Sequence, residues 1–163
     1  MRKLLLMSMM FVAMIALAAC GQGKSAIPED VNALPNATYP VGSDVTIKAN
    51  YQPGMQGAKG KIVGAYDTTA YAVTYTPTTG GAPVKSYKWI IHEEIKSHVK
   101  HPYKPGTEIV LKADHVEGMM GASAKIDSAE TTTVYMVDYT PTTGGSEVKN
   151  YKWLTENELS PAK

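Results

Sequence analysis

The stretch from Asp114 to Met120 brings one imidazole and two thioethers into a single short loop. Histidine and methionine together suit a soft ion such as Cu(I), so His115, Met119 and Met120 are candidate ligands for copper or zinc. The alternative interpretation is that Met119 packs as a flexible filler in a hydrophobic core, because Met55 stands in a similar Gly-Met-x-Gly-Ala stretch. The sequence is consistent with both interpretations.

A second group of histidines, His92, His98 and His101, lies near the acidic residues Glu93 and Glu94. The histidines are separated by five residues and then by two, which matches no standard zinc pattern. We therefore expect them to be solvated side chains of a linker.

Two identical segments, Tyr87-Lys88-Trp89 and Tyr151-Lys152-Trp153, are the best candidates for recognition of a ligand. On a regular strand the Tyr and the Trp point to one face and the Lys to the other. If that face is inward, the aromatic pair belongs to the core. If it lies at the mouth of a barrel, it offers a stacking surface for a sugar, a peptide or a proline-rich segment. The candidate ligand-binding residues are Tyr87, Trp89, Tyr151 and Trp153.

Catalytic chemistry has little support in this sequence. None of the four histidines lies in a recognisable nucleophile motif, and no serine has the context of a nucleophile elbow. Glu93 and Glu94 are sequence neighbours whose side chains diverge, so they do not form an acid and base couple. We expect a protein that is not an enzyme, with no catalytic residues and no cofactor beyond the copper or zinc considered above.

The chain contains an internal duplication at a fixed offset of 64 residues, with residues 39–96 lying over residues 103–160. Twenty-eight of these 58 paired positions are identical, and the segment Thr-Pro-Thr-Thr-Gly-Gly recurs whole. Such a repeat predicts a duplicated small domain. We expect domains at 39–96 and 103–160, joined by a linker at 97–102. The domains should pack together, because one unit of this size buries little apolar area.

Each repeat predicts short strands separated by Gly and Pro. In the segment from Tyr71 to Tyr75, large side chains alternate with small or polar ones, which is typical of a strand with one buried face. Thr-Pro-Thr-Thr-Gly-Gly predicts a hairpin turn, and residues 89–95 predict a single helical turn before a closing strand. The sequence thus predicts an all-β fold of two tandem SH3-like antiparallel barrels, with OB-like barrels as the alternative. Strands are expected at 44–49, 58–65, 69–76 and 83–90 and at the equivalent positions of the second repeat.

The N-terminus has the pattern of an export signal. Arg2 and Lys3 precede an apolar run that ends in small residues before Cys20, which is the only cysteine. Leu-Ala-Ala-Cys resembles the lipobox of bacterial lipoproteins, in which the cysteine receives a diacylglyceryl group with acyl chains such as palmitate. We expect residues 1–19 to be a lipoprotein signal peptide and residues 20–38 to be a flexible tether with a lipidated Cys20.

This signal predicts a location on the extracytoplasmic face of the cell membrane, as in Gram-positive bacteria. Loss of Arg2 and Lys3 with the leader reduces the 16 basic residues to 14, against 15 acidic residues. The basic residues are also dispersed, so we expect no nucleic-acid partner. The expected partners are the membrane, through the N-terminal lipid, and a cell-wall polymer or an envelope protein.

Several motifs together resemble the YdhK-type family of bacterial lipoproteins. They are the lipobox, the loop Gly-Met-x-Gly-Ala, the strand Thr-Thr-x-Tyr-x-Val-x-Tyr-Thr-Pro-Thr-Thr-Gly-Gly and the segment Lys-x-Tyr-Lys-Trp. The resemblance covers essentially the whole chain after the tether. It implies a surface lipoprotein with a tandem domain of unknown function, mainly in Gram-positive bacteria and sometimes encoded near metal-resistance genes. Family members commonly have His-Met before the Gly-Met and His-Lys-Trp in the last strand. Here Tyr51-Gln52 and His115-Val116 fill the first place, and Tyr87 and Tyr151 the second, which weakens the expectation of copper binding.

The leading expectation is a membrane-anchored extracytoplasmic lipoprotein that acts as a non-enzymatic binding or envelope-interaction module. The alternative is a metal-handling surface lipoprotein that binds copper or zinc through His115, Met119 and Met120. Neither expectation names the ligand.

Overall fold

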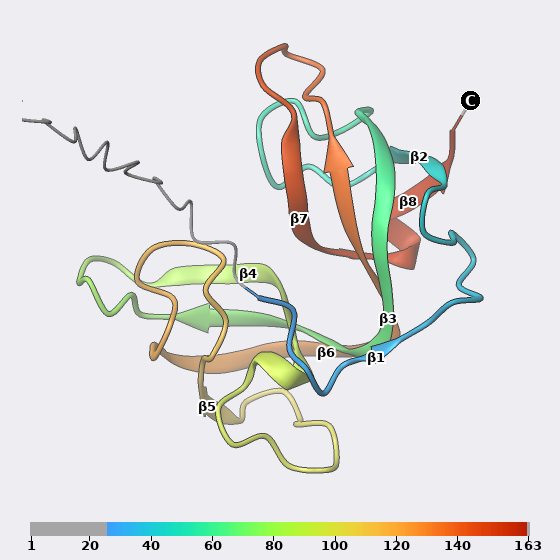
Figure 1. The fold of residues 1–163 in the computed structure, drawn as a ribbon. Coiled ribbons are helices and arrows are strands. Elements are labelled where there is room, and N and C mark those ends of the chain that lie inside the picture. The colour runs from blue at the N-terminus through green and yellow to red at the C-terminus, as the bar shows by residue number, and fades with distance from the viewer. Residues whose placement is uncertain (1–25, 163) are drawn as a thin grey trace, which may run out of the picture.

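The computed structural model describes residues 26–162, in which eight strands and two short 3-10 helices alternate with loops (Figure 1). The predicted all-β fold is confirmed. Among the described residues, no helix is long and apolar enough to cross a membrane. The strands are β1 (Asn32–Ala33), β2 (Asp44–Ile47), β3 (Lys59–Tyr75), β4 (Val84–Ile91), β5 (Glu108–Val110), β6 (Ser123–Tyr139), β7 (Val148–Thr155) and β8 (Leu159–Pro161). The 3-10 helices are η1 (His92–Glu94) and η2 (Glu156–Glu158).

The two longest strands, β3 and β6, have 17 residues each and pair antiparallel along their length. At the midpoint Thr68 pairs with Thr132, which is its own counterpart at an offset of 64 residues. A pseudo-twofold axis therefore passes through this pair. We expected a break between residues 65 and 69, but this stretch has neither Gly nor Pro, and its Tyr and Thr favour extended backbone. The strand continues without interruption through this stretch, and the chain does not reverse here.

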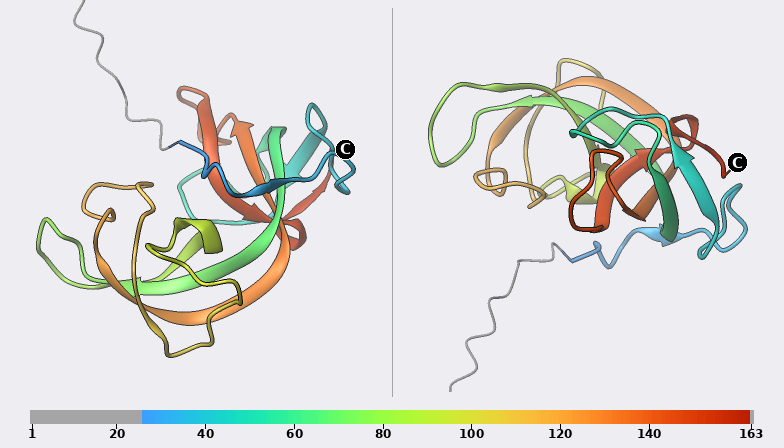
Figure 2. Two further views of the ribbon diagram at one scale, coloured as in Figure 1. Left: turned by 60° about the horizontal axis from the view of Figure 1, so that its bottom comes forward. Right: turned by 90° about the horizontal axis from the view of Figure 1, so that it is seen from above.

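This long two-stranded ladder is shared by two lobes (Figures 1 and 2). The central lobe, residues 69–131, is continuous in sequence and contains the end of β3, β4, η1, β5 and the start of β6. The terminal lobe combines the two ends of the chain, with strand order β7-β6-β3-β2-β8. In the central lobe an isolated bridge between Ile95 and Leu111 takes the place that β8 has in the terminal lobe. Each lobe is a curled antiparallel sheet that does not close into a complete barrel.

The lobes do not coincide with the sequence repeats. We predicted that residues 39–96 and 103–160 each form one barrel, whereas each lobe takes strands from both repeats. The cause is the uninterrupted β3 and β6, which carry half of each repeat across into the other lobe. The two tandem repeats thus exchange half of their strands, so that each lobe is built from both repeats.

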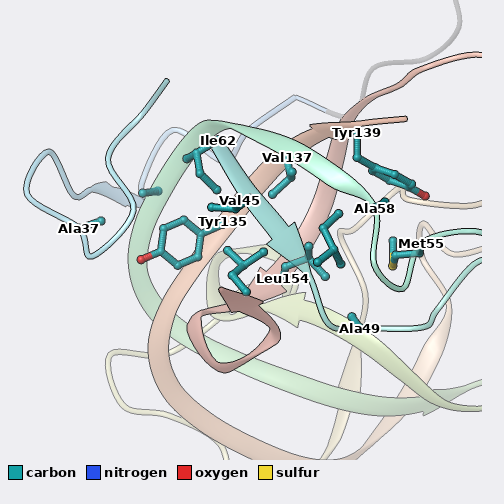
Figure 3. Packing of buried hydrophobic residues seen from close by; sticks show 13 residues of the cluster. Ala37, Val45, Ala49, Met55, Ala58, Ile62, Tyr135, Val137, Tyr139 and Leu154 are labelled. Carbon is teal, nitrogen blue, oxygen red and sulfur yellow. The ribbon is translucent and has the colours of Figure 1, made fainter. Parts of the chain in front are cut away.

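Each hydrophobic core shows this exchange. In the terminal core Ile62 from the first repeat packs with Val137 and Leu154 from the second (Figure 3). In the central core Tyr71 and Val73, on the face that we predicted to be buried, pack with residues of the second repeat. The full terminal core is Ala37, Val45, Ile47, Ala49, Met55, Ala58, Ile62, Ala65, Tyr135, Val137, Tyr139, Leu154 and Leu159.

A third cluster of buried residues lies between the lobes and is called the inter-lobe cluster below. It buries the second face of the long strands, so the small residues Ala70 and Ala72 that we expected on an exposed face are also in contact with the core. Two buried faces on one strand are explained by the second lobe, which covers the face that solvent would otherwise reach. The cluster consists of Tyr66, Ala70, Ala72, Trp89, Ile91, Val134, Met136 and Trp153.

The prediction of a flexible tether is wrong for residues 26–38, because these residues lie on the body of the protein. Strand β1 pairs with β3, and Ile27 and Val31 pack on the inter-lobe cluster. Leu34 packs on the terminal core. These apolar side chains are the physical reason for the docking, since each removes hydrocarbon from water. Cys20 and the predicted signal peptide lie outside the described residues.

The predicted turns and the closing helical turn are confirmed. Gly80 and Gly81 both have positive φ, as do Gly144 and Gly145 in the second repeat. Each turn also contacts a loop of the other repeat, since the backbone N–H of Thr142 donates to the carbonyl of Gly54 at 2.9 Å. A side chain at position 54 would collide with this turn, which explains the glycine there.

Candidate binding cleft between the lobes

A cleft of about 630 Å³ lies between the two lobes, and both candidate tyrosines line it. Tyr87 comes from β4 of the central lobe and Tyr151 from β7 of the terminal lobe. These residues are counterparts in the two repeats, so the pseudo-twofold symmetry brings them to one place. The loop at 114–116, Gln52 and the strand at 147–152 complete most of the walls. A larger hollow of about 740 Å³ lies beside β5, but none of the candidate residues line it.

On the central side of the cleft, the hydroxyl of Tyr87 joins a buried chain of polar groups. The Tyr87 hydroxyl oxygen and His115 Nδ1 are 3.3 Å apart, and His115 Nε2 lies 2.8 Å from Glu94 Oε1. Glu94 Oε2 accepts a hydrogen bond of 3.0 Å from the indole N–H of Trp153 in the other lobe. The side chains of His115 and Glu94 are only 5% and 3% exposed. This chain of polar groups therefore links the lobes away from bulk water.

The 3-10 helices position the glutamates that make these links. In η1 the backbone N–H of Ile91 donates to Glu94 Oε2 at 3.1 Å, and in η2 the backbone N–H of Thr155 donates to Glu158 Oε2 at 2.9 Å. Each bond folds the glutamate back over the start of its own helix, as in a capping box. The carboxylate thereby faces the lobe boundary, where the tryptophan of the other lobe meets it.

The terminal side of the cleft repeats this arrangement with one change. Glu158 accepts a hydrogen bond of 2.9 Å from the indole N–H of Trp89 and another from the hydroxyl of Tyr51. Tyr51 occupies the place that His115 has in the central lobe, at an offset of 64 residues. Tyr51 is 37% exposed, so water reaches this side of the link.

The hydroxyl of Tyr151 makes no hydrogen bond within the described part of the chain, in contrast to the hydroxyl of Tyr87. The Tyr151 ring packs edge-on against Tyr139, with ring centroids 5.9 Å apart. Burial raises the pKa of both Tyr87 and Tyr151 above the usual tyrosine value, so both stay protonated at neutral pH. Tyr151 therefore presents a neutral hydroxyl that can donate and accept a hydrogen bond in the cleft.

The tryptophans of the two candidate segments do not line the cleft. Trp89 is 6% exposed and Trp153 is fully buried, and both belong to the inter-lobe cluster. The prediction that Tyr and Trp share a face is wrong for Tyr87 and Trp89, because the pairing of β4 with β3 shifts between them. Tyr71 pairs with Ile90, yet Val73, two residues on, pairs with Tyr87, three residues back. The extra residue in β4 moves Trp89 to the opposite face.

The cations at the cleft are already paired. Lys149 Nζ lies 2.9 Å from carboxylate oxygens of both Asp138 and Glu147. Lys152 Nζ donates to the backbone carbonyl of Ala26 at 3.1 Å and lies 5.5 Å from the ring centroid of Trp153. Burial lowers the pKa of Lys152 from its usual value. The cleft is thus close to electrically balanced.

The three candidate metal ligands do not converge. Met119 is fully buried in the central core, as Met55 is in the terminal core, whereas Met120 is 56% exposed. Both ring nitrogens of His115 have protein partners, Tyr87 and Glu94. The structure thus places Met119 where the alternative interpretation had it, as a core filler.

The second histidine group is only partly brought together. The rings of His92 and His98 have centroids 5.0 Å apart, while His101 is exposed. His92 Nδ1 lies 2.9 Å from the hydroxyl of Tyr71, and His98 Nε2 lies 3.2 Å from a carboxylate oxygen of Asp30. Within residues 26–162, no group of three or more His, Cys, Asp or Glu side chains is arranged to hold a metal ion.

The glutamates that link the lobes were not among the residues predicted for the site. A signal for them exists, since Glu94 recurs as Glu158 at the repeat offset, whereas its neighbour Glu93 aligns with Asn157. A recurring charged residue among varied neighbours indicates a shared structural task. The contribution of Gln52 to the cleft had no comparable signal, because its counterpart is Val116.

Comparison with known proteins places the chain in a family. A family model described as "Protein of unknown function (DUF1541)" matches residues 41–92 and 105–156. The uncharacterized protein YdhK of Bacillus subtilis (strain 168) is 54% identical over 138 residues, which are 85% of this chain and 67% of that protein.

Solved structures of the Bacillus subtilis protein agree with the fold. The crystal structure of ydhK at 2.00 Å resolution has a TM-score of 0.83 and 53% identity, covering 86% of this chain and 95% of that one. The solution NMR structure of the ydhK C-terminal domain has a TM-score of 0.70 and 57% identity, covering 74% of this chain and 92% of that one. Matches to both repeats, together with a relative of this similarity, show that the chain belongs to the DUF1541 family.

Proposed function

We propose that this DUF1541 protein is a lipid-anchored binding protein on the extracytoplasmic face of the cell membrane, and that it binds its ligand in the cleft between the lobes. The observation that carries the proposal is the hydroxyl of Tyr151, which has no hydrogen-bond partner among residues 26–162 and lies in a cleft lined by a second tyrosine. Buried hydroxyls normally have a partner, so one that is half-buried and open to a cleft is suited to a ligand.

A binding role is better supported than an enzymatic one. The only histidine that lines the cleft is His115, and both of its ring nitrogens are committed to Tyr87 and Glu94. A general base needs a free nitrogen within reach of the proton that it removes. The architecture also suits a receptor, because the two Trp–Glu links hold the two walls of the cleft in a fixed relation.

The membrane anchor rests on the leader and Cys20. In a Cys20→Ser variant we expect the protein to move from the membrane fraction to the soluble fraction, because a chain without a lipid has nothing to insert. Labelling with radioactive palmitate should mark the wild-type protein and not the variant. A variant that stays in the membrane fraction would contradict the anchor.

The binding site is tested with the soluble form, residues 21–163, on purified peptidoglycan, teichoic acid, extracted membrane lipids and detergent-solubilised envelope proteins. We expect one of these to retain the wild-type protein and to retain the Tyr151→Phe variant less well. The matched control is Tyr103→Phe, which removes a hydroxyl from a half-buried tyrosine outside the cleft. Equal retention of all three proteins would contradict binding in the cleft.

The metal-handling alternative has less support, because Met119 and Met120 differ so strongly in burial. A Cu(I) or Zn(II) titration of the soluble form tests it. Submicromolar binding that is abolished by His115→Ala would favour the metal-handling function over the one proposed.

A further inference from the structure

The charges at the cleft disfavour a strongly anionic ligand. Lys149 is shared between two carboxylates, and Lys152 is held by Ala26 and Trp153. A phosphate group is bound in proteins mainly by charge-assisted hydrogen bonds from such cations, and none is left over here. The carboxylate of Asp114 also lines the cleft, without an ion pair among the described residues, and would repel an anion.

Apart from the two lysines, the polar groups that line the cleft are neutral or are acceptors. Tyr151 offers its hydroxyl, and Asn150 offers a side-chain amide that makes no hydrogen bond within residues 26–162. Gln52 Oε1 accepts from the hydroxyl of Tyr139, which leaves its NH₂ group as a donor. A ligand that carries several hydroxyls matches this set, because each hydroxyl donates once and accepts twice.

The remaining surface of the cleft is aromatic and aliphatic. The rings of Tyr87 and Tyr151 and the side chains of Val116 and Met136 supply it. Sugar rings present C–H groups on their faces and hydroxyls at their edges, so they can pack on tyrosine rings while their hydroxyls bond at the rim. The chemistry of the cleft therefore fits an uncharged sugar.

The position of the cleft relative to the anchor limits the candidate sugars to those near the membrane surface. Ala26 and Ile27 line the cleft, and Lys152 holds the carbonyl of Ala26 at 3.1 Å. Cys20 precedes Ala26 by six residues. Six residues span at most about 20 Å when fully extended. With acyl chains on Cys20 in the bilayer, the mouth of the cleft stays within that distance of the lipid headgroups.

From these observations we propose that the ligand is the uncharged sugar headgroup of a membrane glycolipid, bound in the cleft next to Tyr151. This inference rests on the proposed function, since it uses both the lipid on Cys20 and binding in the cleft. A sugar that belongs to a polymer far from the membrane would lie beyond the reach of so short an anchor.

The test uses the mature chain, residues 20–163, with Cys20→Ser, so that only the cleft can hold it on lipid. It is sedimented with vesicles of phosphatidylcholine alone, or with added dihexosyl diacylglycerol, or with added phosphatidylglycerol. We expect binding only with the glycolipid, and a loss of affinity of about threefold to tenfold for Tyr151→Phe, the range of one net hydrogen bond. Tyr103→Phe should bind like the parent chain.

Two results overturn the proposal: equal binding to all three kinds of vesicle, and glycolipid binding that Tyr151→Phe leaves unchanged. The free dihexose, used as a competitor, separates headgroup recognition from nonspecific adsorption and should displace the protein. If the protein does not bind glycolipid vesicles but binds peptidoglycan or an envelope protein in a Tyr151-dependent way, this inference is wrong and the proposed function stands. If no probe shows that dependence, both are wrong.

Discussion

The two lobes have the same strand order and the same link between a glutamate and a tryptophan of the other lobe, but they differ in the residue that contacts the linking glutamate. His115 in the central lobe bridges Glu94 and Tyr87, whereas Tyr51 in the terminal lobe contacts Glu158 and leaves the hydroxyl of Tyr151 without a bond among residues 26–162. One side of the cleft is therefore internally satisfied and the other is open. The exchange of histidine and tyrosine between positions 115 and 51 thus makes the two sides of the cleft chemically different.

Two fragments, one covering a lobe and one covering a sequence repeat, test which of the two is the folding unit. Residues 67–133 contain the whole central lobe in one continuous segment, whereas residues 39–96 contain half of each core. We expect the first fragment to be a folded monomer that unfolds cooperatively. The repeat fragment should be unfolded as a monomer, or folded only as a dimer in which two copies of β3 pair. Circular dichroism and sedimentation at several concentrations distinguish these outcomes, and a folded monomer of 39–96 would contradict the exchanged architecture.

The sequence predicts the local elements of the fold but not the exchange of strands between the lobes. The alternation from Tyr71 to Tyr75, the Gly-Gly turns and the closing helical turn are local patterns, and they were predicted correctly. The exchange of strands was not predicted, because it depends on what is absent at 66–68, where no residue forces a turn. Local sequence patterns do not determine whether a strand pairs within its own repeat or with the similar strand of the other repeat.

The candidate site, like the fold, could be predicted only in part from the sequence. Tyr87 and Tyr151 could be chosen as candidate recognition residues from their aromatic character and recurrence, and the structure places both at one cleft. Their separation from Trp89 and Trp153 could not, because one extra residue in a strand reverses a face without a distinctive sequence signal. The docking of residues 26–38 was also missed, since Ile27, Val31 and Leu34 are too few to form a periodic pattern.

A second test compares the two links between the lobes. Glu94→Ala leaves the buried His115 nitrogen, the Trp153 indole and the Ile91 backbone N–H without their acceptor. We expect a loss of about 3 to 5 kcal/mol in the free energy of unfolding, measured with urea. Glu158→Ala should cost less, because water can reach the partly exposed Tyr51 and replace the carboxylate. A larger loss for Glu158→Ala would contradict the assignment of the buried link.

Alkaline pH gives a third, smaller contrast between the lobes. The hydroxyl of Tyr135 donates to Glu156 at 3.0 Å, and burial together with this carboxylate raises its pKa to about 12. In the unfolded chain a tyrosine titrates near pH 10, so the stabilisation is complete below about pH 10 and is lost as the pH rises toward about 12. The loss should reach about 1 to 3 kcal/mol in urea unfolding.

The matched variants for this contrast are Tyr135→Phe and Tyr71→Phe. Tyr71 is the counterpart of Tyr135, but its hydroxyl meets His92 and no carboxylate. We expect Tyr135→Phe to remove more of the decline in stability above pH 10 than Tyr71→Phe does. Equal slopes in the two variants would show that Glu156 has no part in the effect.

A further variant tests whether the Tyr151 hydroxyl, on the terminal side of the cleft, is needed for binding. In Tyr51→His the new imidazole can bridge Glu158 and Tyr151, as His115 bridges Glu94 and Tyr87 in the central lobe. We expect the protein to stay folded and the affinity for glycolipid vesicles to fall about threefold to tenfold, because the hydroxyl of Tyr151 gains an internal partner. Unchanged affinity, measured by vesicle sedimentation, would mean that this hydroxyl has no role.

The decisive measurement compares Tyr151→Phe with Tyr87→Phe for both stability and ligand binding. Tyr151→Phe should leave the free energy of unfolding within about 0.5 kcal/mol of the parent and weaken binding, because its hydroxyl has no partner among the described residues. Tyr87→Phe should cost about 1 kcal/mol in stability, because His115 loses its partner, and should affect binding less. If the two variants behave alike in both measurements, the difference between the open and the satisfied side of the cleft does not exist.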